Sequence, residues 1–215
     1  MRVLRVIPTL DLGGVQRQLL LASKGLRAHG IELEVCWIDQ PGQFASRFEE
    51  AGVKVHGARF HTRLCVRGLP RLRWLIEKRR YDVVHGHMYL ANMAVNRALI
   101  GNRRTALVNG YHNQILTSNP KQAARIARWR HRPDAFLAVG EAVKASLVEL
   151  DIPAERIRVV QNGVVGPENP APLPERRDGD PLRLVWMGRY VKQKRVDFLV
   201  DVMTACRDQG VPAHL

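Results

Sequence analysis

The sequence predicts an α/β fold in which a parallel sheet is flanked by helices. Short apolar runs alternate with helical stretches along almost the whole chain, and this alternation favours right-handed β-α-β crossovers. The composition agrees, because 46% of the 215 residues are hydrophobic and 25% are charged, which are ordinary values for a globular protein. Disorder, collagen and coiled coil are therefore excluded as descriptions of the whole chain.

Each expected element follows from a local pattern. The first helix is indicated by apolar residues spaced four, three and four apart, at Val15, Leu19, Ala22 and Leu26. Pro70 falls in the first turn of a later helix, where proline is tolerated. The expected strands are 2–7, 31–38, 53–56, 82–85, 105–109, 135–139 and 157–160. The expected helices between them are 15–28, 44–51, 69–80, 90–100, 121–130 and 141–150.

A proline-rich stretch divides the chain into two parts. Residues 166–181 contain Pro167, Pro170, Pro172, Pro174 and Pro181, a density that is incompatible with a helix or a central strand. We therefore expect a first domain over 1–165, a linker over 166–181 and the start of a second domain over 182–215. In that second part we expect a strand over 182–187 and a helix over 195–207. One strand and one helix cannot bury both faces of a sheet, so this domain is expected to be incomplete.

The chain is strongly basic, with a formal net charge of +14. No acidic residue occurs between Asp82 and Asp134. This charge fits either a solvated basic surface or a polyanionic partner, that is, nucleic acid or an anionic membrane. Nucleic acid is not expected, since neither a helix-turn-helix signature nor an RNA-binding aromatic pair is present.

Two helical stretches concentrate the basic residues, 69–80 and 121–132, and each also contains one tryptophan. This composition is typical of a helix that lies on an anionic membrane surface. The alternative is that Trp74 and Leu75 pack on the sheet and leave the arginines in water. No apolar run approaches the ~18 residues that span a bilayer. No signal peptide is visible, and the three cysteines (Cys36, Cys65 and Cys206) are odd in number and far apart. They are interpreted as reduced thiols in a cytoplasmic protein.

Polar residues that follow the expected strands are the candidate site residues. Gly13 and Gly14 lie between the first strand and the first helix, where they would let a ligand approach the backbone, and a plain tight turn is the alternative. His85 and His87 are two residues apart and so share one face of their strand. Two imidazoles are too few for zinc unless His112 is a third ligand. A polar site at the carboxyl edge of the sheet is the favoured interpretation.

The next strands and the second domain add further candidates. His112 ends one strand and could donate to a substrate hydroxyl or stabilise developing charge, or it could simply be packed. Asn162 belongs to an Asn-Gly turn after the last strand of the first domain. Gly188, Arg189 and Lys194 combine a glycine turn with cations, which is the chemistry of a diphosphate cradle.

In their order and spacing these elements together resemble the retaining glycosyltransferases of family 4, which have the GT-B architecture. The resemblance extends over essentially all 215 residues. The matching elements are Gly13 and Gly14 before a Leu/Ala-rich helix, the His29-Gly30 turn, 82–87, Tyr111-His112, 139–150, 160–164, and Gly188-Arg189 with Lys194.

The resemblance implies a role for each domain and for the matching residues. Domain 1–165 would be Rossmann-like and bind the acceptor, 182–215 would begin the nucleotide-sugar-binding domain, and chemistry would occur in the cleft between them. The implied residue roles are donor binding by Gly13, Gly14, Arg189 and Lys194, catalysis by His112 in contact with the transferred sugar, and lining of the acceptor or sugar cleft by His87 and Asn162.

The chain also departs from the family pattern. Gln16 stands where glutamate is common, Gly140 where serine is usual, Val165 in place of aspartate and Arg195 in place of glycine, and these changes bear on the donor more than on the fold. The family's two donor-binding glutamates, spaced by seven residues, would lie beyond Leu215. The chain alone is therefore expected to be an inactive portion of the enzyme.

The implied activity is transfer of a hexose from a nucleotide-sugar to a lipid-linked or saccharide acceptor, with retention, in polysaccharide or glycolipid biosynthesis. No metal and no cofactor are expected, since Arg189 and Lys194 would stabilise the leaving group. The expected location is the cytoplasm, with peripheral attachment to the inner face of the cell membrane. The alternatives are a non-catalytic acceptor- or membrane-binding module and a GT-B nucleotide-sugar epimerase.

Overall fold

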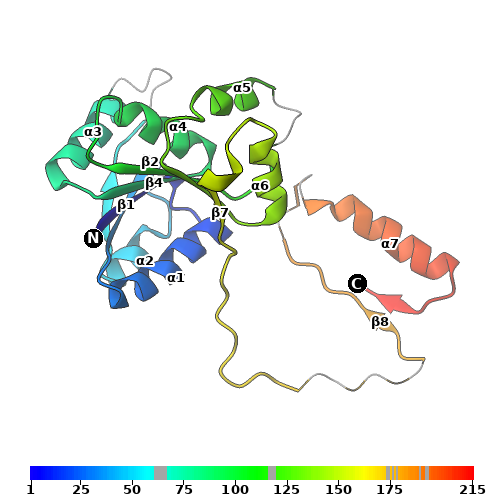
Figure 1. The fold of residues 1–215 in the computed structure, drawn as a ribbon. Coiled ribbons are helices and arrows are strands. Elements are labelled where there is room, and N and C mark those ends of the chain that lie inside the picture. The colour runs from blue at the N-terminus through cyan, green and yellow to red at the C-terminus, as the bar shows by residue number, and fades with distance from the viewer. Residues whose placement is uncertain are drawn as a thin grey trace. The chain divides into compact units, whose positions relative to one another are not determined.

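A parallel sheet organises the larger part of the protein (Figure 1). The computed structural model describes residues 1–60, 67–115, 120–172, 175, 177, 179–188, 190–191 and 194–215. These residues divide into two units, Met1–Val164 and Val165–Leu215. The strands of the first unit are β1 (Arg2–Thr9), β2 (Glu32–Gln40), β3 (Lys54–Gly57), β4 (Val83–His87), β5 (Ala106–Tyr111), β6 (Ala135–Ala138) and β7 (Ile157–Val159). They pair in parallel in the order β3-β2-β1-β4-β5-β6-β7.

Helices cover the two faces of this sheet unequally. They are α1 (Gly14–Ala28), α2 (Ala45–Glu50), α3 (Gly68–Arg79), α4 (Met88–Ala98), α5 (Pro120–Arg128) and α6 (Glu141–Val148), with a short 3-10 helix at Ala154–Arg156. The chain runs from β1 outward to β3 and then returns past β1 to β4. Because each crossover is right-handed, α1 and α2 lie on one face and α3 to α6 lie on the other (Figure 1). The predicted fold class and the order of the elements in this unit are confirmed.

The core follows from strand alternation. Leu4 and Val6 of β1 point to the face of α3 and α4, where they join the largest apolar cluster. Ile7 of β1 and Leu19 of α1 belong to a cluster on the opposite face. Cys36 is buried in the first of these clusters, and both it and Cys206 are free thiols. Cys65 lies outside the described residues.

One buried carboxylate stabilises the amino-terminal edge of the sheet. Glu34 is 1% exposed. It accepts a hydrogen bond of 2.6 Å from the Tyr81 hydroxyl and contacts His56 Nε2 at 2.5 Å and Arg2 Nη2 at 3.3 Å. Burial alone raises the pKa of the Glu34 carboxyl, but the hydrogen bonds from Tyr81 and His56 bring that pKa below its ordinary value. Glu34 is therefore a charged carboxylate that is stabilised by three neighbouring side chains.

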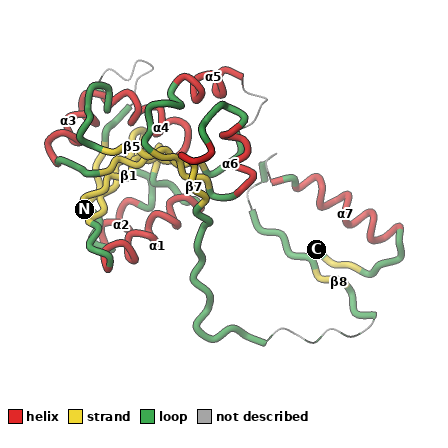
Figure 2. Tube along the Cα trace, viewed as in Figure 1, coloured by secondary structure: helices red, strands yellow, loops and turns green. Residues whose placement is uncertain are grey.

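The second unit is small. It consists of helix α7 (Val196–Asp208) and two short parallel strands, β8 (Leu182–Arg183) and β9 (Ala213–His214) (Figure 2). The prediction of a strand over 182–187 is wrong beyond Arg183, because β9 offers only two residues for pairing. Val185 and Met187 consequently lie 90% and 91% exposed. That this unit begins a donor-binding domain stays a prediction.

The Glu34 network generates a stability prediction. Tyr81→Phe removes one hydrogen bond to a buried carboxylate, so the free energy of unfolding should fall by about 1.5–3 kcal/mol. The matched control is Glu77→Gln, which breaks an exposed ion pair with Arg73 at 2.8 Å and should cost about 0.5 kcal/mol or less. Urea unfolding of both variants measures the difference. Equal losses in the two variants would contradict the account of Glu34.

Candidate functional site

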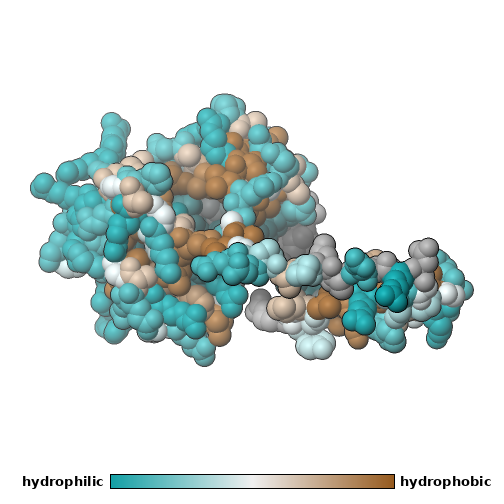
Figure 3. All heavy atoms as spheres, turned by 90° about the horizontal axis from the view of Figure 1, so that it is seen from below, coloured by the Kyte–Doolittle hydropathy of each residue, from teal (hydrophilic) through white to brown (hydrophobic). Residues whose placement is uncertain are grey.

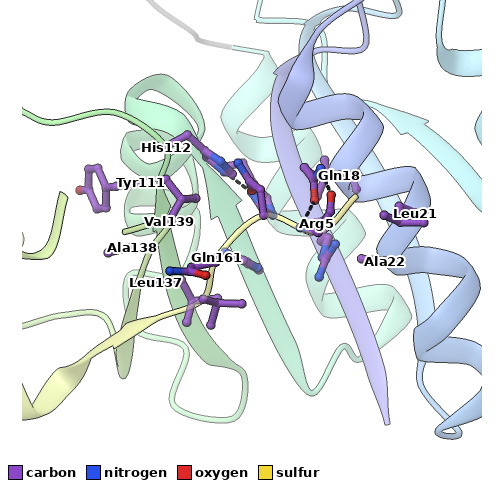
Figure 4. Close-up of a pocket in the computed structure, with 17 residues that line it drawn as sticks. Arg5, Gln18, Leu21, Ala22, Tyr111, His112, Leu137, Ala138, Val139 and Gln161 are labelled. Carbon is purple, nitrogen blue, oxygen red and sulfur yellow. Dashed lines mark hydrogen bonds between the residues drawn. The ribbon is translucent and has the colours of Figure 1, made fainter. Parts of the chain in front are cut away.

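A pocket of about 290 Å³ lies in the first unit, on the side of the sheet where α1 is found. It is bordered by α1, by β1 and β4, by the carboxyl ends of β5 and β6, and by the segment that follows β7 (Figure 4). Viewed from below, this side of the unit shows apolar surface surrounded by hydrophilic residues (Figure 3). The polar side chains among its lining residues are Arg5, Gln18, His85, His87, Tyr111, His112, Gln161 and Asn162.

The pairing of β1 with β4 positions the centre of this pocket. Arg5 and His85 are direct neighbours in the register of the two strands. Since alternate residues of a strand point to opposite faces, Arg5 points away from the cluster that contains Leu4 and Val6. The sheet reverses its winding direction between β1 and β4, and such a switch point is where open α/β sheets bind ligands.

Three imidazoles form a row that starts at this point. The ring centroids of His85 and His87 are 3.9 Å apart, and Nδ1 of His87 lies 3.0 Å from Nε2 of His112. The row requires glycine at position 110, because a Cβ there would lie 2.7 Å from Nε2 of His85. The structure therefore brings together the predicted site residues His87 and His112.

The three imidazoles are uncharged at neutral pH. Burial, followed by the nearby Arg5 charge, lowers the pKa of His112, and burial together with neighbouring positive groups holds the pKa values of His85 and His87 well below 6.5. A neutral imidazole has one N–H and one lone pair. Whichever ring donates in the His87–His112 contact, one of the pair's two outer nitrogens carries an N–H and the other a lone pair. Neither outer nitrogen has a hydrogen-bond partner among the described residues.

Arg5 contributes the positive charge of the pocket. Its Nε is buried and makes no hydrogen bond to any described residue. Burial lowers the pKa of the guanidinium to about 10, so the group remains charged at neutral pH. The lining residues include no aspartate or glutamate in the described part of the chain.

A side-chain amide closes one side of the pocket. Gln18 of α1 donates to the Gly163 carbonyl at 2.6 Å and accepts from the Gly163 N–H at 3.0 Å. This pair ties α1 to the segment after β7, in which the predicted site residue Asn162 is exposed and lines the pocket. Asn162 thus shares the pocket with His87 and His112.

The predicted donor-binding glycines lie elsewhere in the same unit. Gly13 caps α1, and a Cβ on it would lie 2.5 Å from Oε1 of Gln16. Gln16 in turn donates to the Thr9 carbonyl at 2.9 Å, so its side-chain amide lies over Gly13. Gly14 has open space above it. Neither glycine lines the pocket, and their role toward a donor stays a prediction.

Only one of the two cations predicted to bind the donor diphosphate lies among the described residues. Lys194 is exposed in the second unit, and its backbone N–H donates to the Val191 carbonyl at 2.8 Å. Arg189 lies outside the described residues, so the pairing of the two cations stays a prediction.

The described part of the chain contains neither a metal-binding cluster nor a membrane-spanning helix. No group of three or more His, Cys, Asp or Glu side chains within it is arranged to hold a metal ion. None of its helices has both the length and the apolar character needed to cross a bilayer.

Sequence reasoning missed Arg5 and Gln18. A signal for Arg5 was available, because it is a charged residue inside the apolar run 2–7. Gln18 gave no signal, since its partner is 145 positions away in the chain.

The buried imidazoles predict how stability depends on pH. Their pKa values are depressed in the folded state, so the unfolded chain binds protons first as the pH falls below about 6.5. The three neutral imidazoles therefore contribute fully to the free energy of unfolding above about pH 6.5, and this contribution is lost as the pH falls below that value. The free energy of unfolding should change by at most about 4 kcal/mol per pH unit for three groups. Denaturant titrations between about pH 7 and pH 5.5 measure this slope. His85→Gln should reduce it, whereas replacing exposed His131 by Gln should not. A slope that is the same in both variants would contradict the assignment.

Comparisons with known proteins bear on the family and the fold. The sequence profile of Glycosyltransferase Family 4 matches residues 12–165. Anabaena HepE in complex with UDP has a similar structure, with a TM-score of 0.66 and 16% identity over 76% of this chain and 44% of HepE. The apo form of WaaB, a lipopolysaccharide outer core galactosyltransferase, gives a TM-score of 0.66 and 16% identity over 94% of this chain and 57% of WaaB.

A UDP-GlcNAc 2-epimerase from Neisseria meningitidis, solved with UDP-GlcNAc bound, is also similar, with a TM-score of 0.55 and 16% identity over 75% of this chain and 47% of that one. The chain thus spans about half the length of these proteins, and at such identities they show the GT-B fold alone. Comparison with curated protein sequences gives no match. Because the family profile covers well over half of the residues, the chain belongs to Glycosyltransferase Family 4.

Proposed function

We propose that the chain is the acceptor-binding part of a glycosyltransferase that moves a hexose from a nucleotide-sugar to a saccharide or lipid-linked acceptor. The observation that carries this proposal is the row of neutral imidazoles that ends in His112, in a pocket at the switch point of the sheet. Its volume of about 290 Å³ is near the lower end for ligand pockets, which suits a single sugar ring better than a whole nucleotide-sugar. The activity would serve polysaccharide or glycolipid synthesis.

The donor side of the proposal rests on the family and on similar structures. HepE has been solved with UDP and with UDP-glucose, which supports a nucleotide-sugar as the donor here. In the reaction an acceptor hydroxyl would replace the nucleoside diphosphate on the anomeric carbon, with retention and release of one proton. Gly13 and Gly14 would lie near the donor phosphates, and Arg189 and Lys194 would stabilise the departing diphosphate.

His112 would act on the transferred sugar. A neutral imidazole can accept a hydrogen bond from a sugar hydroxyl or donate one to it, and the contact with His87 holds its ring in place. The 215-residue chain by itself is expected to bind an acceptor.

The activity is tested in a polypeptide that joins this chain to a complete second domain. His112→Ala should lower kcat by about 10²-fold or more, as expected for loss of a group that acts in the transition state, with little change in the unfolding temperature. His131→Ala, at an exposed histidine, is the matched control and should leave kcat unchanged. The assay follows release of nucleoside diphosphate from a panel of nucleotide-sugars with and without acceptor.

The outcomes separate the alternatives. Near-normal turnover in His112→Ala would sink the catalytic role. Conversion of one nucleotide-sugar into its epimer without an acceptor would identify a nucleotide-sugar epimerase instead, as in the similar epimerase structures. Binding of sugars without any turnover in the joined polypeptide would identify a binding module.

We also propose that α3 places the enzyme on an anionic membrane. Trp74 is 57% exposed, with Nζ of Lys78 lying 4.4 Å from its ring centroid, whereas Leu75 is buried in the core. The equivalent residue near α5, Trp129, packs partly buried against the core, so α3 offers the more accessible aromatic anchor. Cations near an anionic leaflet contribute about 1 kcal/mol each, which supports reversible attachment.

Membrane attachment is tested by co-sedimentation with vesicles of neutral or mixed neutral and anionic phospholipid. Binding should be confined to anionic vesicles and should weaken at high salt. Trp74→Ala should reduce binding, whereas Tyr190→Ala, at an aromatic residue of the second unit that is 85% exposed, should not. Binding that ignores vesicle charge, or no binding at all, would leave the basic surface without a membrane role.

A further inference from the structure

Arg5 is a half-buried charge with a buried Nε and without a counter-charge in the described chain. It lies in the middle of β1 beside His85, at the base of the pocket. No ion pair joins it to any described residue, and its Nε has no hydrogen-bond partner there. Buried charges in proteins are normally paired, because an unpaired one forfeits its hydration. The position of Arg5 therefore indicates that an anion belongs in the pocket.

The surroundings of Arg5 favour an anion over any other ligand. The imidazoles of His85, His87 and His112 present nitrogens without partners among the described residues, and an N–H at one end of the His87–His112 pair can donate to an oxyanion. Carboxylates, which would repel an anion, are absent from the described lining. The remaining walls are largely apolar, with Leu21 on one side and Leu137 and Val139 on the other, so a charge pair would be weakly screened.

The contrast with Glu34 shows that the chain does supply partners for a structural charge. Glu34 is buried on another part of the sheet and is contacted by Tyr81, His56 and Arg2. Arg5 is less deeply buried than Glu34, and its Nε has no hydrogen-bond partner within the described residues. A purely structural role for Arg5 would be expected to come with a similar set of contacts.

We propose that this pocket binds an oxyanion carried on a sugar ring, a carboxylate or a phosphate, and that Arg5 selects it. The inference rests on the proposed function and narrows it, because the acceptor then belongs to the acidic sugars. The guanidinium would pair with two oxygens of the anion, the imidazoles of His85 and His87 would hydrogen-bond the anion or the ring hydroxyls, and the apolar walls would pack on the ring, which leaves His112 at the far end of the row for the transferred sugar.

The test measures binding to the 215-residue chain by calorimetry at neutral pH. The ligands are D-glucose, D-glucuronate, D-glucose 6-phosphate and inorganic phosphate. At least one acidic sugar should bind about tenfold or more tightly than glucose, and about tenfold or more tightly than inorganic phosphate, because the ring adds its own contacts. Preference for glucuronate or for glucose 6-phosphate identifies the source of the oxyanion.

Two variants locate the anion. Arg5→Met keeps most of the side-chain volume and should abolish the preference for the acidic sugar, whereas Arg5→Lys should retain part of it. The matched control is Arg17→Met, at an exposed arginine in the first turns of α1, which should leave the preference intact. Thermal unfolding checks that each variant is folded. If Arg5→Met is not folded, the imidazole NMR signals of the unmodified chain serve instead, and they should shift with the acidic sugar but not with glucose.

Several results would overturn the inference. These are equal affinity for glucose and both acidic sugars, no binding of either acidic sugar, an unchanged preference in Arg5→Met, and loss of the preference in Arg17→Met. No nucleotide is present in this assay, so its failure leaves transfer to a neutral acceptor standing. Conversely, the joined polypeptide could bind the acidic sugar through Arg5 and show no turnover. That result would contradict the proposed glycosyl transfer and leave the anion site standing.

Discussion

The parallel pairing of β1 with β4 is the constraint on which the rest of the first unit depends. At this pairing the chain reverses the direction in which it builds the sheet, so right-handed crossovers place α1 and α2 on one face and α3 to α6 on the other. Of the described helices only α1 lines the pocket. The same pairing sets Arg5 beside His85. The β1–β4 pairing therefore determines both the arrangement of the helices and the position of the charged and polar groups in the pocket.

Two charged groups of the sheet, Glu34 and Arg5, differ in how their charges are stabilised. Glu34 has a hydroxyl, an imidazole and a guanidinium around it, and these contacts offset the cost of its burial. Arg5 is surrounded by neutral imidazoles and apolar side chains, and burial, followed by nearby positive groups that include Arg5, lowers the pKa values of those imidazoles. The first arrangement fixes the sheet, whereas the second leaves unused hydrogen-bonding capacity that a ligand can satisfy.

The sequence predicts the strands and helices of the first unit well, because apolar runs and helical spacing are local signals. It also predicts that His87 and His112 come together, since the carboxyl ends of neighbouring parallel strands meet at one edge. It does not reveal that Arg5 joins them, because the β1–β4 register pairs residues 80 positions apart in sequence and cannot be read from either strand alone. The link between Gln18 and Gly163 is hidden for the same reason.

The second unit is predicted less well. The expected strand 182–187 is paired only at Leu182 and Arg183, opposite the two residues of β9. Gly13 illustrates a different difficulty. The Gln16 side chain folds over it, and neither Gly13 nor Gly14 lines the pocket, so the sequence does not reveal where these glycines lie relative to the imidazoles.

The most direct test of the account is a crystal structure of the chain with D-glucose 6-phosphate or D-glucuronate bound. The account places the acidic group at the β1–β4 switch point, with its oxygens about 2.7–2.9 Å from the Arg5 guanidinium and the ring between Leu21 and Leu137. An acidic group bound instead at the first turn of α1 beside Gly13 and Gly14, with the pocket around Arg5 unoccupied, would contradict it.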